Sequence, residues 1–234
     1  MEKQIKSKKR VADHGEVFTP SHIVNAMLDL VKQETERIDS RFLEPACGTG
    51  NFLTEILERK LSVVENRYGR SQLDYERYAI LAVSSIYGID ILEDNVQECR
   101  KRLFAIINQR YSELFKKTAK EQFRKAARFI LERNILWGDA LTLKTGGDNP
   151  EYIVFSEWSL VNGSMLKRRD FTFHGLLRHK ETRQALLFPD LDEKSAQQLS
   201  LFSDLGEDVF IPMPEKEYPP VYFMEIGEAT NGRQ

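Results

Sequence analysis

The pattern of apolar and polar residues predicts strands and helices that alternate along most of the chain. The predicted strands are the short apolar runs at 42–43, 134–141, 152–159 and 221–226, together with 87–91, which ends an apolar stretch that begins at 79. The predicted helices, in which apolar residues recur at helical spacing, cover 21–31, 52–61 and 93–133, the last interrupted near 117–118. This alternation favours an α/β fold with a mostly parallel sheet and helices on both of its faces.

Composition limits the class of protein. The 234 residues are 41% hydrophobic and 30% charged, which suits one domain with a real core. The formal net charge of −2 excludes a general polycation, so any contact with nucleic acid must come from local charge. Cys47 and Cys99 are the only cysteines, and no apolar run approaches the roughly 20 residues of a membrane span. We therefore expect a cytoplasmic protein without a disulfide framework, a membrane segment or a metal site.

The run from Glu44 to Leu53 predicts a tight turn between a strand and a helix. Gly48 and Gly50 let the backbone turn sharply and approach a ligand, because neither carries a Cβ atom. The free N–H groups of the following helix point at whatever lies over the turn. A glycine turn of this kind occurs in many nucleotide-binding folds and also as a purely structural feature, so spacing alone does not identify the ligand.

Two segments resemble motifs of S-adenosylmethionine-dependent DNA methyltransferases that modify the adenine amino group. All ten residues from Glu44 to Leu53 fit motif I of that family, which reads acidic-Pro-Ala-Cys-Gly-Ser/Thr-Gly-x-Phe-Leu. Residues 15–20, Gly-Glu-Val-Phe-Thr-Pro, resemble its motif X, which reads Gly-x-Phe/Tyr-Thr-Pro. Motif X before motif I is the order of the gamma group, which includes type I modification subunits and type IIG enzymes. The resemblance implies a Rossmann-like methyltransferase fold and S-adenosylmethionine as the cofactor.

The resemblance also implies roles for individual residues. Phe18 would lie near the cofactor and Thr19 would contact its methionine end, while Ile91 would pack on adenine. Asp90 would accept hydrogen bonds from the ribose hydroxyls, because a carboxylate can accept two at once, although an acid at this position can also simply end a strand. Asp139 would accept a hydrogen bond from the adenine amino group. The complete set of expected cofactor residues is Phe18, Thr19, Pro20, Glu44, Pro45, Ala46, Cys47, Gly48, Gly50, Asn51, Phe52, Asp90, Ile91, Asp139 and Ala140.

The resemblance breaks at the catalytic motif. Family members carry Asn/Asp-Pro-Pro-Tyr/Phe, whose first residue accepts hydrogen bonds from the target amino group and whose aromatic residue stacks on the flipped base. The chain contains no such tetrapeptide. At the corresponding strand it has Ser156, Glu157 and Trp158, which are the candidate catalytic positions. An acceptor and an aromatic side chain are shifted there by one residue, which turns a strand side chain to the other face. The family's catalytic role is therefore not transferred to them, and they either line the pocket or pack at its edge.

The predicted domain organisation has four parts: a flexible basic arm at 1–13, an S-adenosylmethionine-binding domain at 14–183, an acidic flexible linker at 184–214, and a C-terminal strand and tail at 215–234. The arm has five basic and two acidic residues and either touches phosphates or is simply solvated. Residues 100–133 contain eleven Lys or Arg and three Glu, which suits a phosphate-facing surface or a solvated face equally.

Partners and function are inferred from these features as expectations. The leading interpretation is a DNA adenine methyltransferase-like protein of a restriction-modification or phage-defence system, with a variant catalytic motif and DNA as partner. The alternatives are a non-catalytic S-adenosylmethionine-binding subunit that acts through a specificity or catalytic partner, and an RNA or protein methyltransferase. The segment Gln198–Phe202, Gln-Leu-Ser-Leu-Phe, resembles the peptide by which bacterial replication and repair proteins dock on the sliding clamp. Leu and Phe residues of this kind can also attach a tail to the core of its own chain.

Overall fold

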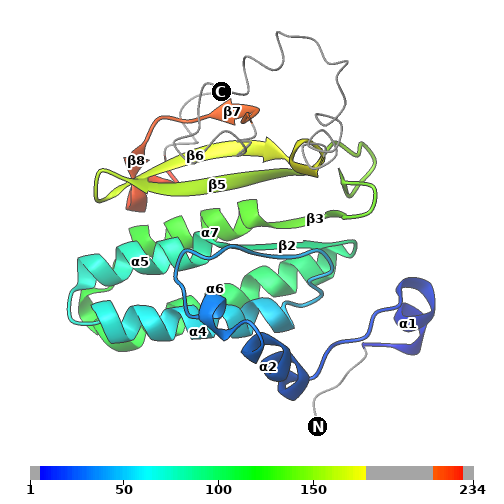
Figure 1. Cartoon of the computed structure of the whole chain (residues 1–234), viewed down its shortest axis with the longest axis horizontal. Helices are drawn as coiled ribbons and strands as arrows, with labels where there is room; N and C mark the ends of the chain where they lie inside the picture. The colour runs from blue at the N-terminus through cyan, green and yellow to red at the C-terminus, as the bar shows by residue number, and fades with distance from the viewer. Residues whose placement is uncertain (1–5, 178–212, 229–234) are drawn as a thin grey trace, which may run out of the picture.

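The computed structural model describes residues 6–177 and 213–228 of the chain (Figure 1). The helices are α1 (Lys8–His14), α2 (Ser21–Asp29), α3 (Lys32–Thr35), α4 (Asn51–Tyr68), α5 (Gln72–Ser84), α6 (Glu93–Phe115) and α7 (Glu121–Asn134), with 3-10 turns η1 (Lys116–Thr118) and η2 (Phe223–Glu225). The strands are β1 (Phe42–Glu44), β2 (Ile86–Asp90), β3 (Ile135–Asp139), β4 (Lys144–Thr145), β5 (Val154–Val161), β6 (Met165–Thr172), β7 (Lys216–Glu217) and β8 (Val221–Tyr222).

The first sheet has the strand order β1-β2-β3-β4. β1 pairs with β2 and β2 pairs with β3 in parallel, whereas the short β4 pairs with β3 in the antiparallel sense. Parallel neighbours need a long crossover, and here α4 and α5 join β1 to β2 while α6 and α7 join β2 to β3. This arrangement confirms the predicted α/β, Rossmann-like fold and puts the carboxyl ends of β1, β2 and β3 at one edge.

Both faces of the central strand β2 are covered. All five of its residues are buried, which is typical of a parallel strand packed on both sides. Ile86 belongs to the main core, which α4 to α7 build with their apolar faces. Tyr87 and Ile89 point to the other face and pack against Ile153 and Phe155. The sequence pattern predicts helices on both faces of the sheet. Among the described residues, Ile153 and the start of β5 cover this second face of β2.

The strand after β4 belongs to a second, antiparallel sheet, in which β6 pairs with β5, β7 and β8 (Figure 1). β5 runs opposite to β3. Its approach begins at Tyr152, which bridges to Lys144 beside the carboxyl end of β3. Further along, Trp158 donates its Nε1–H to Asn134 Oδ1, 2.9 Å away, at the amino end of β3. β5 therefore carries its later residues away from the edge where the parallel strands end.

Part of the predicted N-terminal arm lies within the described residues and contains a short helix. Helix α1 begins after Ser7, whose hydroxyl oxygen accepts a hydrogen bond from the Arg10 amide, and it ends at Gly15 with φ +65°. The sequence predicts a flexible arm over 1–13, and this stays a prediction; in the structure, Lys6 and Arg10 of this segment form ion pairs with Asp94 at the start of α6.

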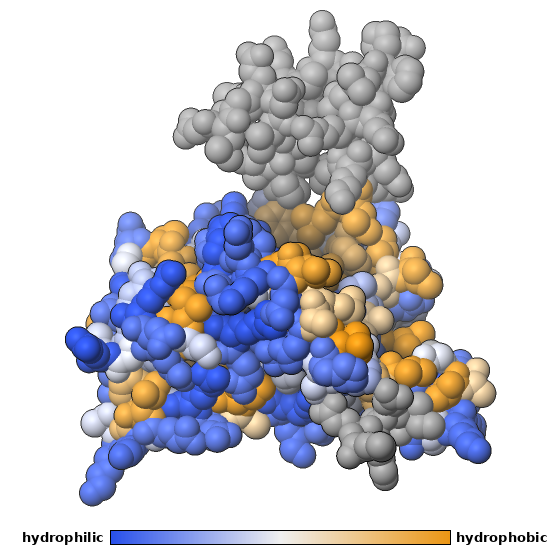
Figure 2. Space-filling view, turned by 60° about the horizontal axis from the view of Figure 1, so that its bottom comes forward, coloured by the Kyte–Doolittle hydropathy of each residue, from blue (hydrophilic) through white to orange (hydrophobic). Residues whose placement is uncertain are grey.

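The surface is uneven in polarity. Figure 2 shows one face on which a broad hydrophilic area adjoins a region where apolar side chains gather. Helix α2 turns Val24 and Leu28 into the core and leaves Met27 and Leu30, at its end, exposed. Within residues 6–177 and 213–228, no helix combines the length and the apolar character needed to cross a membrane.

Candidate ligand-binding site

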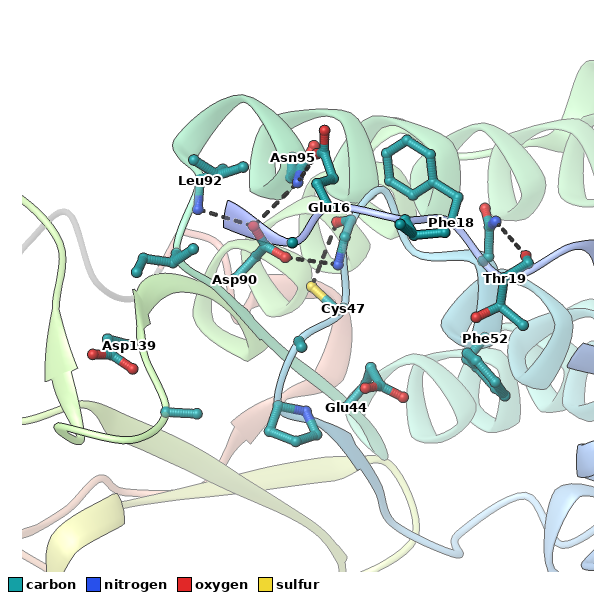
Figure 3. A pocket seen from close by; sticks show the side chains of 18 of the residues that line it. Glu16, Phe18, Thr19, Glu44, Cys47, Phe52, Asp90, Leu92, Asn95 and Asp139 are labelled. Carbon is teal, nitrogen blue, oxygen red and sulfur yellow. Dashed lines mark hydrogen bonds between the residues drawn. The ribbon is translucent and has the colours of Figure 1, made fainter. Parts of the chain in front are cut away.

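A pocket of about 560 Å³ opens at the carboxyl ends of β1, β2 and β3 (Figure 3). Its volume falls within the range of roughly 300–1,000 Å³ that is typical of small-molecule sites. The walls of the pocket come from four segments, namely 15–19 before α2, 44–52 at the glycine turn, 90–95 from the end of β2 into α6, and 138–141 at the end of β3. Ligands of doubly wound folds bind at this edge of the sheet.

The glycine turn has the geometry that its sequence predicts. Gly48 and Gly50 have φ values of +53° and +89°, which favour glycine over other residues. A Cβ atom on Gly50 would lie 2.6 Å from Cys99 Sγ, so the turn packs directly on α6. The Cys47 amide donates to the Ile89 carbonyl, 2.8 Å away, which joins the turn to β2. Contact with the Cys99 thiol and burial raise the pKa of Cys47, so this thiol stays protonated and is no nucleophile.

Side-chain hydrogen bonds hold the segment before α2 against the glycine turn. Asn51 Nδ2 donates to the Thr19 carbonyl at 2.9 Å, as Figure 3 shows. Arg102 of α6 donates through Nη1 to Asn51 Oδ1 at 2.8 Å and to the Thr49 carbonyl at 2.7 Å. The ring of Phe18 lies over Gly48, 3.3 Å from the position of a Cβ atom. These contacts hold Phe18 and Thr19 against the glycine turn at one wall of the pocket.

Asp90 is buried at the tip of β2, and protein groups already bind both of its oxygens. Oδ2 accepts a hydrogen bond from the Gly48 amide at 2.8 Å. Oδ1 accepts one from the Leu92 amide at 2.9 Å and one from Asn95 Nδ2 at 3.2 Å. The carboxylate is therefore fixed in orientation, and it links β2, the glycine turn and α6.

Four carboxylates face the pocket, and no Lys, Arg or His is among the described residues that line it; the acids are Glu16, Glu44, Asp90 and Asp139. Glu16 forms an ion pair with Arg10 behind the pocket wall, so the unpaired negative charge comes from the other three. Glu44 is only partly exposed, and burial raises its pKa. Burial without a cationic partner disfavours a charged carboxylate, and a cation placed nearby would reverse this effect. The pocket thus favours a ligand that carries positive charge and disfavours phosphates.

The structure brings most of the expected cofactor residues together in this pocket. The residues that line it are Phe18, Thr19, Glu44, Pro45, Ala46, Cys47, Gly48, Asn51, Phe52, Asp90, Ile91, Asp139 and Ala140. Pro20 and Gly50 flank it without lining it. The sequence reasoning missed Glu16 and Asn95, which also line the pocket. Glu16 lies inside the Gly-x-Phe-Thr-Pro segment and Asn95 lies in the first turn of α6, five residues after Asp90; these positions are the signals that could have indicated them.

The three candidate catalytic positions lie elsewhere. Ser156, Glu157 and Trp158 are not among the pocket residues, because β5 carries them toward the amino ends of the parallel strands. The Ser156 hydroxyl is buried and donates to Asp170 Oδ1 at 2.8 Å. Trp158 is buried against α7, and Glu157 forms ion pairs with Arg41 and Arg169. Each side chain therefore has a structural partner in or near the second sheet.

An α/β fold with a ligand pocket at the carboxyl ends of its parallel strands defines a Rossmann-like binding domain. The model of the N-6 DNA Methylase family matches residues 4–122, which is just over half of the chain. The chain belongs to the N-6 DNA methylase family. The matched range includes three of the four pocket segments and ends before Asp139 and β5. Searches of curated proteins and of solved structures found no match.

Proposed function

We propose that this chain binds S-adenosylmethionine in the acid-lined pocket and acts in DNA adenine methylation, within a restriction-modification or defence system. One observation carries the proposal, namely that three of the four carboxylates at the pocket, those of Glu44, Asp90 and Asp139, form no ion pair among the described residues, and that no cationic side chain lines the pocket there. S-adenosylmethionine carries a sulfonium, an ammonium and a carboxylate, so its net charge is positive. Nucleotide cofactors with phosphates would meet repulsion here.

The individual contacts support this assignment. The partly buried Glu44 gains a cationic partner if the ammonium or sulfonium lies beside it. Ile91 is 56% exposed at the pocket and offers an apolar surface for the adenine ring. Asp139 Oδ1 accepts the Leu141 amide at 2.8 Å, which orients the carboxylate and leaves Oδ2 to accept a hydrogen bond from an adenine amino group.

A second candidate function is a cofactor-binding subunit that methylates only together with a partner chain. The direction of β5 favours it, because Ser156, Glu157 and Trp158 lie away from the pocket and are held by other side chains. Attack by an adenine amino group needs a hydrogen-bond acceptor that lies beside the methyl donor. Under this alternative a partner chain supplies that acceptor, the stacking surface for the flipped base and the recognition of the target sequence.

Transfer of a labelled methyl group tests both candidate functions. Purified chain is incubated with labelled S-adenosylmethionine and unmethylated genomic DNA, with RNA and protein as alternative acceptors and Asp139→Ala as the pocket variant. Labelled N6-methyladenine in DNA that Asp139→Ala removes would establish a complete enzyme. Cofactor binding without transfer would establish the subunit, and label in RNA or protein would refute DNA as the substrate.

The docking peptide for a sliding clamp, Gln198–Phe202, lies outside the described residues and remains a proposal from its sequence alone. A peptide of residues 195–206 that binds purified clamp in fluorescence anisotropy, and loses binding on Gln198→Ala, would support it.

A further inference from the structure

Asn95 joins two carboxylates at one wall of the pocket. Its side-chain amide is buried, and Nδ2 donates to Glu16 Oε1 at 2.8 Å and to Asp90 Oδ1 at 3.2 Å (Figure 3). Its Oδ1 accepts from Lys6 Nζ at 2.6 Å and from Arg10 Nη2 at 3.2 Å. The reverse orientation of the amide would place its oxygen against two carboxylates and its NH2 group against two cations. The charges around Asn95 therefore permit one orientation, which holds Glu16 beside Asp90.

Counting hydrogen bonds shows that Asp90 is nearly saturated. A carboxylate offers about four acceptor sites. The amides of Gly48 and Leu92 and the side chain of Asn95 use three of those on Asp90. A ribose presents two vicinal hydroxyl donors, so Asp90 can accept from one of them, and the other needs a different acceptor.

Glu16 is the acceptor that lies beside Asp90. Its Oε1 accepts from Asn95 and from Arg10 Nη2 at 2.8 Å each, and its Oε2 accepts from Arg10 Nε at 2.6 Å. One of its roughly four sites remains, and Glu16 lines the same pocket as Asp90. We propose that Glu16 accepts a hydrogen bond from one ribose hydroxyl of the cofactor while Asp90 accepts one from the other. This inference rests on the proposed cofactor.

Helix α1 belongs to the site in this arrangement. Arg10 binds Glu16 through two nitrogens and Asp94 at the start of α6 through two more contacts, of 2.7 and 3.0 Å. Arg10 thereby links the 15–19 segment to α6 through ion pairs and fixes the orientation of the Glu16 carboxylate. Arg10 is a positioning residue, because it acts on the ligand through Glu16.

Ligands that lack single hydroxyls test the pairing of Glu16 with Asp90. Dissociation constants are measured by calorimetry for S-adenosylhomocysteine and its 2′-deoxy and 3′-deoxy analogues. In the wild-type chain each missing hydroxyl weakens binding by about tenfold, the loss of one hydrogen bond to a charged group. In Glu16→Ala the parent ligand binds about tenfold more weakly, and one of the two deoxy analogues binds as well as the parent.

Two further variants separate a ligand contact from a structural effect. Arg10→Met keeps the Glu16 carboxylate but frees it, so we expect a smaller loss, of about threefold, and a smaller penalty for the same deoxy analogue. Lys9→Met removes an exposed charge from the same helix and leaves all three constants unchanged. If Glu16→Ala weakens the parent and both analogues by one common factor, the pairing is wrong and the proposed function stands. A wild-type chain that binds none of the three ligands overturns the pairing, and one that also fails to bind S-adenosylmethionine overturns the proposed function.

Discussion

Substitution of Gly50 by alanine tests the packing of the glycine turn on α6. Gly50 is the N-cap of α4 with φ +89°, a conformation that costs an alanine roughly 1–2 kcal/mol. The added Cβ atom would lie 2.6 Å from Cys99 Sγ, and relief of such an overlap in a packed core costs about 1–3 kcal/mol. The free energy of unfolding of Gly50→Ala should therefore fall by about 2–5 kcal/mol in total.

A double-mutant cycle with Cys99→Ala separates the two contributions. Without the sulfur, the nearest Cys99 atom to the new methyl group is Cβ at 3.4 Å, so only the backbone cost of about 1–2 kcal/mol remains. Urea unfolding followed by circular dichroism gives the free energy of unfolding for wild type, both single variants and the double variant. A coupling energy of about 1–3 kcal/mol is expected for residues in contact. Equal costs of Gly50→Ala in both backgrounds would refute the steric part of the reasoning.

Three further substitutions test the site and its supports. Glu44→Gln should raise the thermal midpoint of the ligand-free chain, because burial raises the pKa of Glu44 and its charged form opposes folding at neutral pH. The same substitution should weaken the binding of S-adenosylmethionine. The affinity of the wild-type chain should fall as the pH drops through the raised pKa of Glu44. Burial lowers the pKa of Lys60 from 10.5 to about 7, so above pH 7 the folded chain releases a proton that the unfolded chain keeps. Between about pH 7 and 9 the free energy of unfolding of wild type should therefore rise with pH relative to that of Lys60→Met, by less than about 1.4 kcal/mol per pH unit because three carbonyl oxygens accept hydrogen bonds from Nζ and favour its charged form. A difference that falls with pH in urea unfolding would contradict this. Trp158→Phe leaves the buried Asn134 Oδ1 without its hydrogen-bond donor, so the free energy of unfolding should fall by about 1–3 kcal/mol in urea unfolding. A loss of S-adenosylmethionine affinity in the same variant would show that Trp158 contributes to the pocket.

The glycine turn is predictable from sequence because its chemistry is local. Positive φ angles at Gly48 and Gly50 result from the residues themselves, and the helix after the turn is indicated by apolar spacing. The same spacing predicts the break between α6 and α7, which falls at Lys116–Thr118 as expected. The pocket segments then meet because parallel strands bring their carboxyl ends to one edge.

The course of β5 is harder to predict, because the direction of a strand depends on the turn and the partner strand that come after it. The dipeptide Asn162-Gly163, with φ values of +48° and +81°, makes a tight turn into β6, and an Asn-Gly pair between apolar runs is a strong hairpin signal. That signal marks an antiparallel sheet and so argues against a catalytic strand of the parallel kind. Glu16 and Asn95 escape prediction for a different reason, because hydrogen bonds between residues 79 positions apart in the chain leave no local pattern.

Direct measurement of ligand binding tests the central claim that the acid-lined pocket holds S-adenosylmethionine. Calorimetric titrations of the wild-type chain with S-adenosylmethionine, ATP and NAD, each repeated on Asp90→Asn and Asp139→Ala, compare a cationic ligand with anionic ones at the same site. We predict that S-adenosylmethionine binds, that both variants weaken its binding by about tenfold or more, and that ATP and NAD bind more weakly than S-adenosylmethionine. Tighter binding of ATP or NAD than of S-adenosylmethionine, or affinity that neither variant changes, would contradict the account.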